Sequence, residues 1–330
     1  MKIAPLTAIA LLLALALGAR AAQRTDSQRA EQEELLAWVN TLRYQARIEQ
    51  ATAVCETILA SDPDCVDAWI EHGVLALSEE RLEQAQEDFR EALKRRRGDP
   101  MALLGRARVT RAQGDEDRAM RDARKALARC PHLIDAEKAD ADTWYQRGLA
   151  KVLLEDDTAL QDFVMAVSLD PGHMDAHTQR AQIYRGQGRT QDAIDQLTKA
   201  VRTRPDYAVG YLARARLHYE AGDLDASIAD CNRALEINPH CARAWHNRGL
   251  VSLQRGDLEA AISDLSEAIA ADPDYASAHV YRGQAYLAFG NEAAARADWE
   301  CAKELEPDAW AGETAAKLLG ELQQTPADAE

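Results

Sequence analysis

The sequence is poor in positive charge. Its 39 Lys and Arg residues are outnumbered by 55 Asp and Glu residues, which gives a formal net charge of -16. Proteins that bind nucleic acid neutralise phosphates with Lys and Arg, so this balance argues against a nucleic-acid partner. The one basic run, residues 94–97, falls where a helix is expected to end, and the helix dipole favours positive charge there. A docking patch is the second interpretation of this run.

Sequence motifs of catalysis are missing. The chain has no glycine-rich phosphate loop, no His-Glu-x-x-His pattern and no Gly-x-Ser-x-Gly elbow. A zinc site can be imagined from Cys231, His240, Cys241 and His246, but their spacing is not that of a zinc finger and Cys231 is expected to face the core. The sequence therefore predicts a protein that is not an enzyme and that holds no cofactor and no metal.

Long apolar runs are missing except at the start of the chain. Residues 8–17 are apolar, a lysine precedes them, and Ala19 and Ala21 form a small-x-small cleavage site. This pattern predicts a secretory signal peptide over residues 1–21. An uncleaved membrane anchor is the alternative, although the apolar stretch is shorter than the ~20 residues of a spanning helix. We expect an exported protein, periplasmic or secreted, with no membrane span after signal cleavage.

Cysteine is sparse, with six residues in the chain. Two pairs share a spacing of ten, Cys55 with Cys65 and Cys231 with Cys241, and an oxidising compartment would allow a disulfide in each. The first cysteine of each pair lies inside a predicted helix and the second in the following loop, beyond the ~7 Å reach of a disulfide. We favour the interpretation that Cys55 and Cys231 are small buried apolar residues.

What the sequence does contain is a repeat of 34 residues. Prolines recur at this step from Pro171 to Pro307, and glycines recur at the same step from Gly188 to Gly290. A period of this length is typical of a two-helix repeat, and two-helix repeats stack into solenoids.

One copy, residues 242–275, shows how the repeat is built. Its apolar residues follow the three-and-four spacing of two short amphipathic helices. Gly256 and Asp257 are expected to separate the helices, the glycine by a left-handed backbone and the aspartate by capping the next helix. Pro273 ends the second helix because proline cannot continue the hydrogen-bond ladder. Small residues such as Gly249 allow the two helices to approach closely.

This unit resembles the tetratricopeptide repeat family, whose pattern places an aromatic residue, Leu-Gly, tyrosine, alanine and proline at fixed spacing. The match is close in four copies and looser in the earlier ones. The close copies begin at Met174, Ala208, Ala242 and Ala276, and the looser ones lie around Val66, Pro100 and Trp144. The resemblance implies an all-α, right-handed superhelical solenoid of about eight antiparallel helix pairs.

The expected organisation follows from these copies. The segments are 1–21 as signal peptide, 32–65 as a degenerate N-terminal helix pair, 66–140 and 141–307 as repeats, 308–322 as a C-terminal capping helix, and 323–330 as a disordered tail. The capping helix is expected to cover the last repeat with apolar residues that include Trp310.

One departure from the family pattern recurs. Most copies have arginine where the family usually has leucine before the glycine, and an aspartate recurs at a matching position of the second helix. The pairs are Arg106 with Asp122, Arg147 with Asp162, Arg214 with Asp230, Arg248 with Asp264, Arg282 with Asp298, and His72 with Asp88; Arg180 faces Gln196 instead. We predict an ion pair within each of these repeats because a half-buried arginine needs a partner. A ligand-binding ladder of arginines is the alternative.

The resemblance also implies a concave groove, lined by the first helix of each pair, that receives an extended peptide or a partner helix. The residues expected to bind there are Arg108, Arg111, Arg185, Arg216, Tyr219, Arg243, Asn247 and Tyr281, with Gln182, His246 and Gln284 beside them. Because the arginines would give an acidic protein a positive groove, we expect the ligand to be an acidic, extended segment of a partner protein.

The sequence thus predicts an exported scaffold that mediates protein–protein interaction through its groove. An accessory or regulatory subunit of an envelope enzyme complex is the alternative, and a thiol or metal protein that uses the cysteines is the third possibility.

Overall fold

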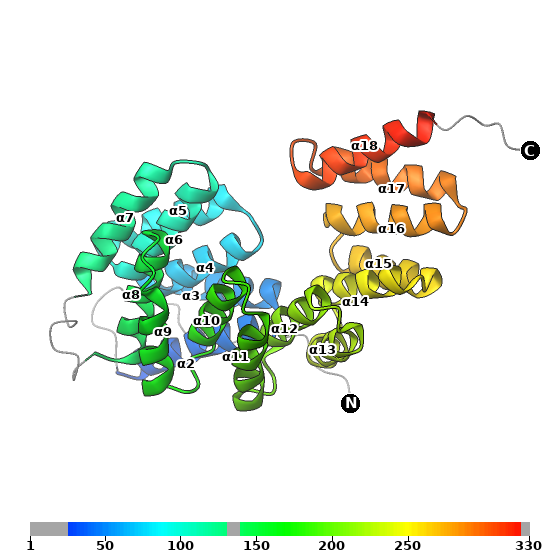
Figure 1. Cartoon of the computed structure of the whole chain (residues 1–330). Helices are drawn as coiled ribbons and strands as arrows, with labels where there is room; N and C mark the ends of the chain where they lie inside the picture. The colour runs from blue at the N-terminus through cyan, green and yellow to red at the C-terminus, as the bar shows by residue number, and fades with distance from the viewer. Residues whose placement is uncertain (1–25, 131–138, 325–330) are drawn as a thin grey trace, which may run out of the picture. The chain divides into compact units, whose positions relative to one another are not determined.

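The computed structural model describes residues 26–130 and 139–324, and every regular element in these ranges is a helix (Figure 1). The helices are α2 (Asp26–Tyr44), α3 (Ile48–Ser61), α4 (Val66–Ser78), α5 (Leu82–Arg95), α6 (Pro100–Ala112), α7 (Glu116–Arg129), α8 (Ala141–Leu153), α9 (Ala159–Leu169), α10 (Met174–Gly186), α11 (Thr190–Thr203), α12 (Ala208–Glu220), α13 (Leu224–Ile237), α14 (Ala242–Arg255), α15 (Leu258–Ala271), α16 (Ala276–Ala288), α17 (Glu292–Leu305) and α18 (Trp310–Gln324). The all-α prediction is confirmed. The predicted signal peptide and most of the predicted tail lie outside the described residues.

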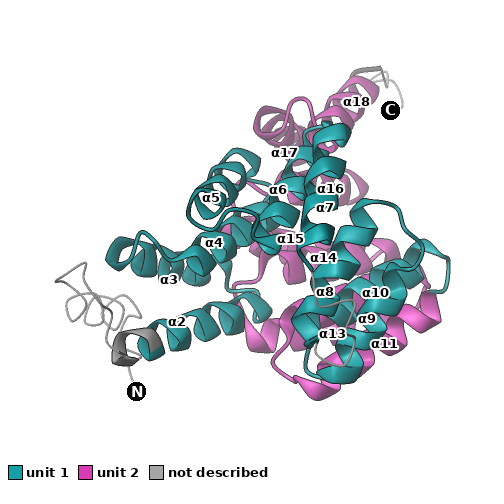
Figure 2. Cartoon of the chain, turned by 90° about the vertical axis from the view of Figure 1, so that its left-hand side faces the viewer, with its two compact units in different colours: residues 1–189 teal, residues 190–330 magenta. Residues whose placement is uncertain are grey.

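The helices form two compact units, residues 1–189 and residues 190–330 (Figure 2). The described part of unit 1 runs from α2 to α10, and that of unit 2 from α11 to α18. Within each unit the two helices of a repeat pack against each other, and each repeat packs against the next along the chain. The boundary falls between α10 and α11, inside the repeat that begins at Met174.

The turn between the two helices of a repeat keeps one backbone conformation throughout. Gly256 ends α14 with a left-handed backbone, at a φ of 81°, as predicted. The equivalent residue is also left-handed in the copies that have no glycine there, for example Glu80 with a φ of 59°. Asp257 makes no side-chain cap to α15, contrary to expectation, whereas Asp223 and Asn291 at the same position accept from the backbone of α13 and α17. The turn therefore depends on backbone geometry more than on the cap.

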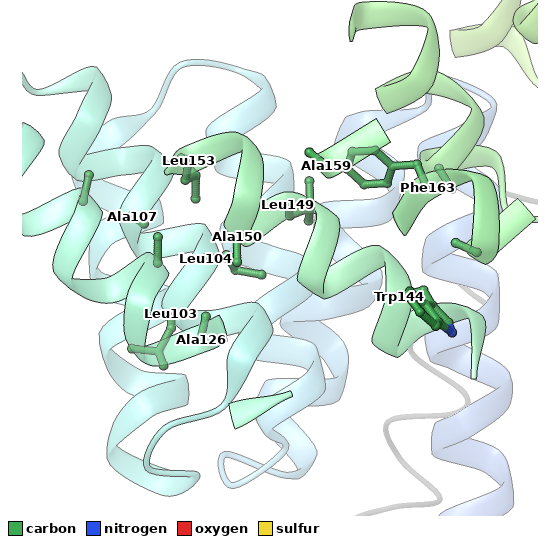
Figure 3. Packing of buried hydrophobic residues seen from close by; sticks show 14 of the residues in the cluster. Leu103, Leu104, Ala107, Ala126, Trp144, Leu149, Ala150, Leu153, Ala159 and Phe163 are labelled. Carbon is green, nitrogen blue, oxygen red and sulfur yellow. The ribbon is translucent and has the colours of Figure 1, made fainter. Parts of the chain in front are cut away.

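Close approach of the helices rests on a small residue of the first helix that faces a large one of the second. A Cβ atom added at Gly148 would lie 2.6 Å from the ring of Phe163, and one at Gly283 would lie 2.4 Å from the indole of Trp299. Figure 3 shows Phe163 of α9 near Leu149 of α8 in the buried cluster of unit 1. These rings occupy the space that the glycines leave.

Ion pairs join the two helices of most repeats, as predicted. The guanidinium of Arg248 donates from Nε and Nη2 to the two carboxylate oxygens of Asp264 at 2.8 and 2.7 Å. The same two-point contact recurs in Arg106 with Asp122, Arg147 with Asp162, Arg214 with Asp230, and Arg282 with Asp298, and His72 contacts Asp88. All six aspartates are buried. We call this series the ion-pair ladder.

In unit 2 the ladder also joins neighbouring repeats. The third guanidinium nitrogen of Arg248 donates to Asn232 Oδ1 at 2.6 Å, on the second helix of the preceding repeat. Arg214 and Arg282 reach Thr198 and Ser266 in the same way, at 3.0 and 3.1 Å. Each of these arginines therefore holds three helices together. The sequence analysis predicts only the ion pair within the arginine's own repeat and not the contact with the preceding one.

The repeat that lacks the aspartate behaves differently. Arg180 has its Nε shielded from solvent, and no described carboxylate forms an ion pair with it. The Oε1 atom of Gln196 is likewise shielded and has no hydrogen-bond partner among the described residues. This is the repeat that the boundary between the two units divides.

Replacing Arg248 by leucine is expected to leave Asp264 buried without its partner and to lower the free energy of unfolding by about 1–3 kcal/mol. The double variant Arg248→Leu/Asp264→Leu is expected to lose much less, because it removes both charges together. Denaturant unfolding followed by circular dichroism measures both changes. Arg180→Leu is the matched control and is expected to cost little. Equal losses in the single and double variants would contradict the pairing.

Candidate peptide-binding surface

The first helices of successive repeats contact one another within each unit, from α4 to α8 in unit 1 and from α12 to α16 in unit 2. We call the layer that they form the first-helix face. The residues predicted to bind a ligand are divided between the units: Arg108, Arg111 and Arg185 lie in unit 1, and Arg216, Tyr219, Arg243, Asn247 and Tyr281 lie in unit 2.

In unit 1 an ion cluster joins α2, α4 and α10, the first helices of three repeats. Arg43, near the end of α2, donates to the two carboxylate oxygens of Asp175 on α10 at 3.1 and 2.9 Å. The hydroxyl of Tyr44 donates to Asp175 at 3.2 Å, and Glu71 of α4 lies 3.7 Å from Arg43 Nε. Helices 132 residues apart in the sequence are thus held in contact. We call these four residues the α2–α10 cluster.

Burial and charge act in opposite directions in the α2–α10 cluster. Burial alone would raise the pKa of Asp175, but the charge of Arg43 and the hydrogen bonds from Arg43 and Tyr44 outweigh it, so this pKa lies below its ordinary value. Burial raises the pKa of Glu71, and the charge of Arg43 only partly offsets that effect. Asp175 is therefore the carboxylate that the arginine holds ionised.

The predicted residues of unit 1 differ in their surroundings. Arg108 is exposed on α6, and Arg185 is exposed at the end of α10. Arg111 is engaged within the fold, because it pairs with Glu116 and donates to the carbonyl oxygen of Leu153 at 2.7 Å. It joins α6 to the end of α8.

In unit 2 the predicted residues share the first-helix face. Arg216 and Tyr219 lie on α12, Arg243 and Asn247 on α14, and Tyr281 on α16. Arg216 and Arg243 are exposed, and Arg216 donates to Glu220 one turn along its own helix at 3.1 Å. An exposed pair of this kind contributes little to stability, so Arg216 can turn to a partner at small cost.

Aromatic rings follow one another across the same face. The ring of His246 on α14 lies 5.6 Å from that of Tyr281 on α16, which lies 5.8 Å from that of Trp310 on α18. Trp310 is 54% exposed and is outside the apolar cluster that the rest of α18 forms with α17. Trp310 therefore contacts the last repeat through the ring of Tyr281 and not through that apolar cluster. We call these three residues the ring series.

His246 is the buried end of the ring series. Its ring also lies 4.8 Å from that of Tyr275, and its Nε2 atom is shielded without a hydrogen-bond partner among the described residues. Burial lowers the pKa of His246 to about 4, and the contact of Nδ1 with Asn247 only partly opposes this shift. The ring is therefore neutral at physiological pH and serves as an apolar support for Tyr281.

Models of the tetratricopeptide repeat match most of the chain, at residues 36–85, 70–134, 157–208, 178–240 and 213–285. The chain belongs to the tetratricopeptide repeat family. No curated protein sequence matches it significantly.

Solved structures with a TM-score above 0.5 share the fold over most of the chain. The APC/C hetero-tetramer Cut9-Hcn1 is 16% identical, with a TM-score of 0.56 over 97% of this chain and 64% of that chain. A tetratricopeptide repeat protein from Parabacteroides merdae is 19% identical, with a TM-score of 0.51 over 78% of this chain and 99% of that chain. MamA is 25% identical over 48% of this chain and 94% of that chain, with a TM-score of 0.44.

Proteins of the tetratricopeptide repeat family bind other proteins, which makes this chain an interaction scaffold of the solenoid class.

The other candidate sites are weaker. No disulfide bond forms among the six cysteines, which all lie in the described residues. Cys55 and Cys231 are fully buried as predicted, and burial raises the pKa of Cys231 to about 12, which makes its thiol unreactive. Among residues 26–130 and 139–324, no group of three or more His, Cys, Asp and Glu side chains is placed to hold a metal ion. Every helix in these ranges is too short or too polar to span a bilayer.

The pKa of His246 predicts a pH effect on stability. An unfolded chain exposes this histidine, which then titrates near its ordinary pKa of ~6.5. Between ~6.5 and about 4 the unfolded chain therefore binds a proton that the folded chain does not, and stability falls as the pH drops. The loss from this residue is expected to be about 2 kcal/mol between pH 7 and pH 5.

The variant His246→Phe is expected to remove this contribution, because a phenyl ring keeps the contacts with Tyr275 and Tyr281 and does not titrate. Denaturant unfolding at both pH values measures the difference from the wild type. His240→Gln is the control, since His240 is exposed. If His246→Phe lost as much stability between pH 7 and pH 5 as the wild type does, His246 would not be the cause of the loss.

Proposed function

We propose that the protein binds an extended, acidic segment of a partner protein on the first-helix face of unit 2. The observation that carries this proposal is the ring series with its exposed Trp310, in a unit whose first-helix face also carries the exposed cations Arg216 and Arg243. Tryptophan and arginine are both enriched at protein interfaces. It offers apolar area for a side chain of the ligand and charge for its carboxylates.

The first-helix faces of the two units differ in the contacts that a ligand would have to displace, and this difference favours unit 2. In unit 1 the α2–α10 cluster occupies the first-helix face, so a ligand there would have to displace the contacts of Arg43 with Asp175. Breaking a shielded ion pair without replacing it is unfavourable. In unit 2 a ligand needs only to displace exposed contacts such as that of Arg216 with Glu220.

Selection from a phage-displayed library of random peptides with the full chain as bait tests this proposal. The selected peptides are expected to be rich in Asp and Glu and to contain an aromatic or aliphatic residue for the ring series. Synthetic copies are expected to bind Arg216→Glu/Arg243→Glu and Trp310→Ala at least about tenfold more weakly, or ~1.4 kcal/mol. Higher salt is expected to weaken binding to the wild type.

Asp175→Asn is the control variant, because it alters the α2–α10 cluster in unit 1 and leaves unit 2 unchanged. It is expected to bind the selected peptides as the wild type does. Peptides without acidic residues, or undiminished binding to the two unit 2 variants, would place the interaction elsewhere. Circular dichroism of each variant checks that it is folded.

We further propose that the chain is exported, on the basis of the predicted signal peptide over residues 1–21. N-terminal sequencing of the protein from its native cell envelope or medium is expected to read from near Ala22. A protein that retains residues 1–21 in the membrane fraction would favour the uncleaved anchor.

A further inference from the structure

A basic pocket lies between α5, α6 and α7 in unit 1. It has a volume of about 250 Å³ and is lined by Leu93, Arg97, Gly98, Leu103, Arg106, Lys125 and Arg129. Four of the seven lining residues are cations and none is an acid, in a protein whose net charge is -16. Two of the three helices are second helices, so the pocket is separate from the first-helix face.

Most of the nearby basic run is explained by the fold. Lys94 and Arg95 pair with Glu91, and Arg96 donates to Asp67 and Asp99. These contacts support the interpretation that the run ends α5 and ties it to its neighbours. Arg97 is different, because no described residue pairs with it and it is exposed on the pocket wall.

The cations of the pocket exceed the available negative charge. Asp122 stands beside the pocket and is already held at both oxygens by Arg106, while Lys125 lies 3.5 Å from it. Arg129, like Arg97, has no ion pair with any described carboxylate. The guanidinium groups of Arg97 and Arg129 and the ammonium group of Lys125 therefore line one cavity with little negative charge to neutralise them.

Equivalent positions in the other repeats show that the fold does not need this charge. Arg96, Arg97 and Gly98 stand where the copy over residues 32–65 has Asp-Pro-Asp at 62–64 and the copy over residues 242–275 has Asp-Pro-Asp at 272–274. The position of Lys125 varies in charge among the repeats, with Glu91 and Glu267 in two of them and Lys199 and Arg233 in two others. The position of Arg97 is proline in the other junctions, at residues 63, 131, 171, 205, 239, 273 and 307, so ending the helix does not require a cation there.

Gly98 shapes the pocket. Its φ is 79°, and a Cβ atom at this position would lie 3.1 Å from Arg129 Nε. An aspartate here, as in the copies over residues 32–65 and 242–275, would be strained by the positive φ, which those copies do not have, and would crowd Arg129. Glycine leaves the guanidinium room to lie against the loop, and Leu93 and Leu103 supply an apolar wall beside it.

We infer that this pocket binds a phosphate group, either as free phosphate or on a small ester. Arginine pairs with phosphate through two parallel hydrogen bonds, and a dianion compensates the unpaired cations better than a single carboxylate does. The apolar wall fits a short carbon moiety attached to the phosphate. The site is distinct from the peptide-binding surface proposed above and does not depend on it.

Isothermal titration of the full chain with inorganic phosphate, phenyl phosphate and acetate, at constant ionic strength, tests the assignment. Both phosphates are expected to bind and acetate is not. Tighter binding of phenyl phosphate identifies the ester as the source, and equal binding identifies free phosphate. Arg97→Gln/Arg129→Gln is expected to weaken phosphate binding about tenfold or more, since each guanidinium supplies charge-assisted hydrogen bonds.

The matched control is Arg124→Gln, which removes an exposed arginine of α7 that does not line the pocket. It is expected to bind phosphate as the wild type does. The inference is overturned if neither phosphate binds, if acetate binds as well as phosphate, or if the two variants lose affinity equally. Peptides selected on unit 2 are expected to bind the pocket variant unchanged, so the two proposals can fail separately.

Discussion

A buried arginine–aspartate contact is the constraint on which the repeats of this protein depend. The family pattern fills this position with leucine, which needs no partner, whereas Arg248 needs Asp264 on the facing helix and a polar atom on the preceding repeat. Removing two charges from water is costly, and the cost is recovered only when geometry and hydrogen bonding are complete. The ladder therefore fixes the register of the helices more strictly than apolar packing would, because a guanidinium that slips by one turn loses its carboxylate.

The interruption of the ladder has a structural counterpart. Five repeats pair arginine with aspartate and one pairs histidine with aspartate, but the repeat that begins at Met174 offers Gln196 to Arg180. The chain divides into its two units inside that same repeat. An amide cannot neutralise a guanidinium, so the sequence gives Arg180 no acid at the position that pairs in the repeats of the ladder. A single acid-to-amide difference thus coincides with the place where one compact unit ends and another begins.

Most of the fold could be predicted from the sequence, because a solenoid is specified by contacts between neighbours. The period, the left-handed turn at Gly256 and the pairing of Arg248 with Asp264 all follow from residues less than one repeat apart. The α2–α10 cluster could not be predicted, since Arg43 and Asp175 are 132 residues apart and no motif marks them. Their meeting depends on small rotations summed over several repeats, which local patterns do not encode.

The proposed binding features of this chain lie where one repeat departs from the others. Residues that most copies share, such as the ladder and the small residues opposite large rings, are accounted for by packing. Packing does not explain Arg43, Trp310 or Arg97, because each occurs in one copy only and none completes the core of its own repeat. A tandem array provides its own control, because the same backbone position can be compared across copies of nearly equal structure. At the junction after α5, Arg97 stands where every other junction has proline, so ending the helix does not require its charge.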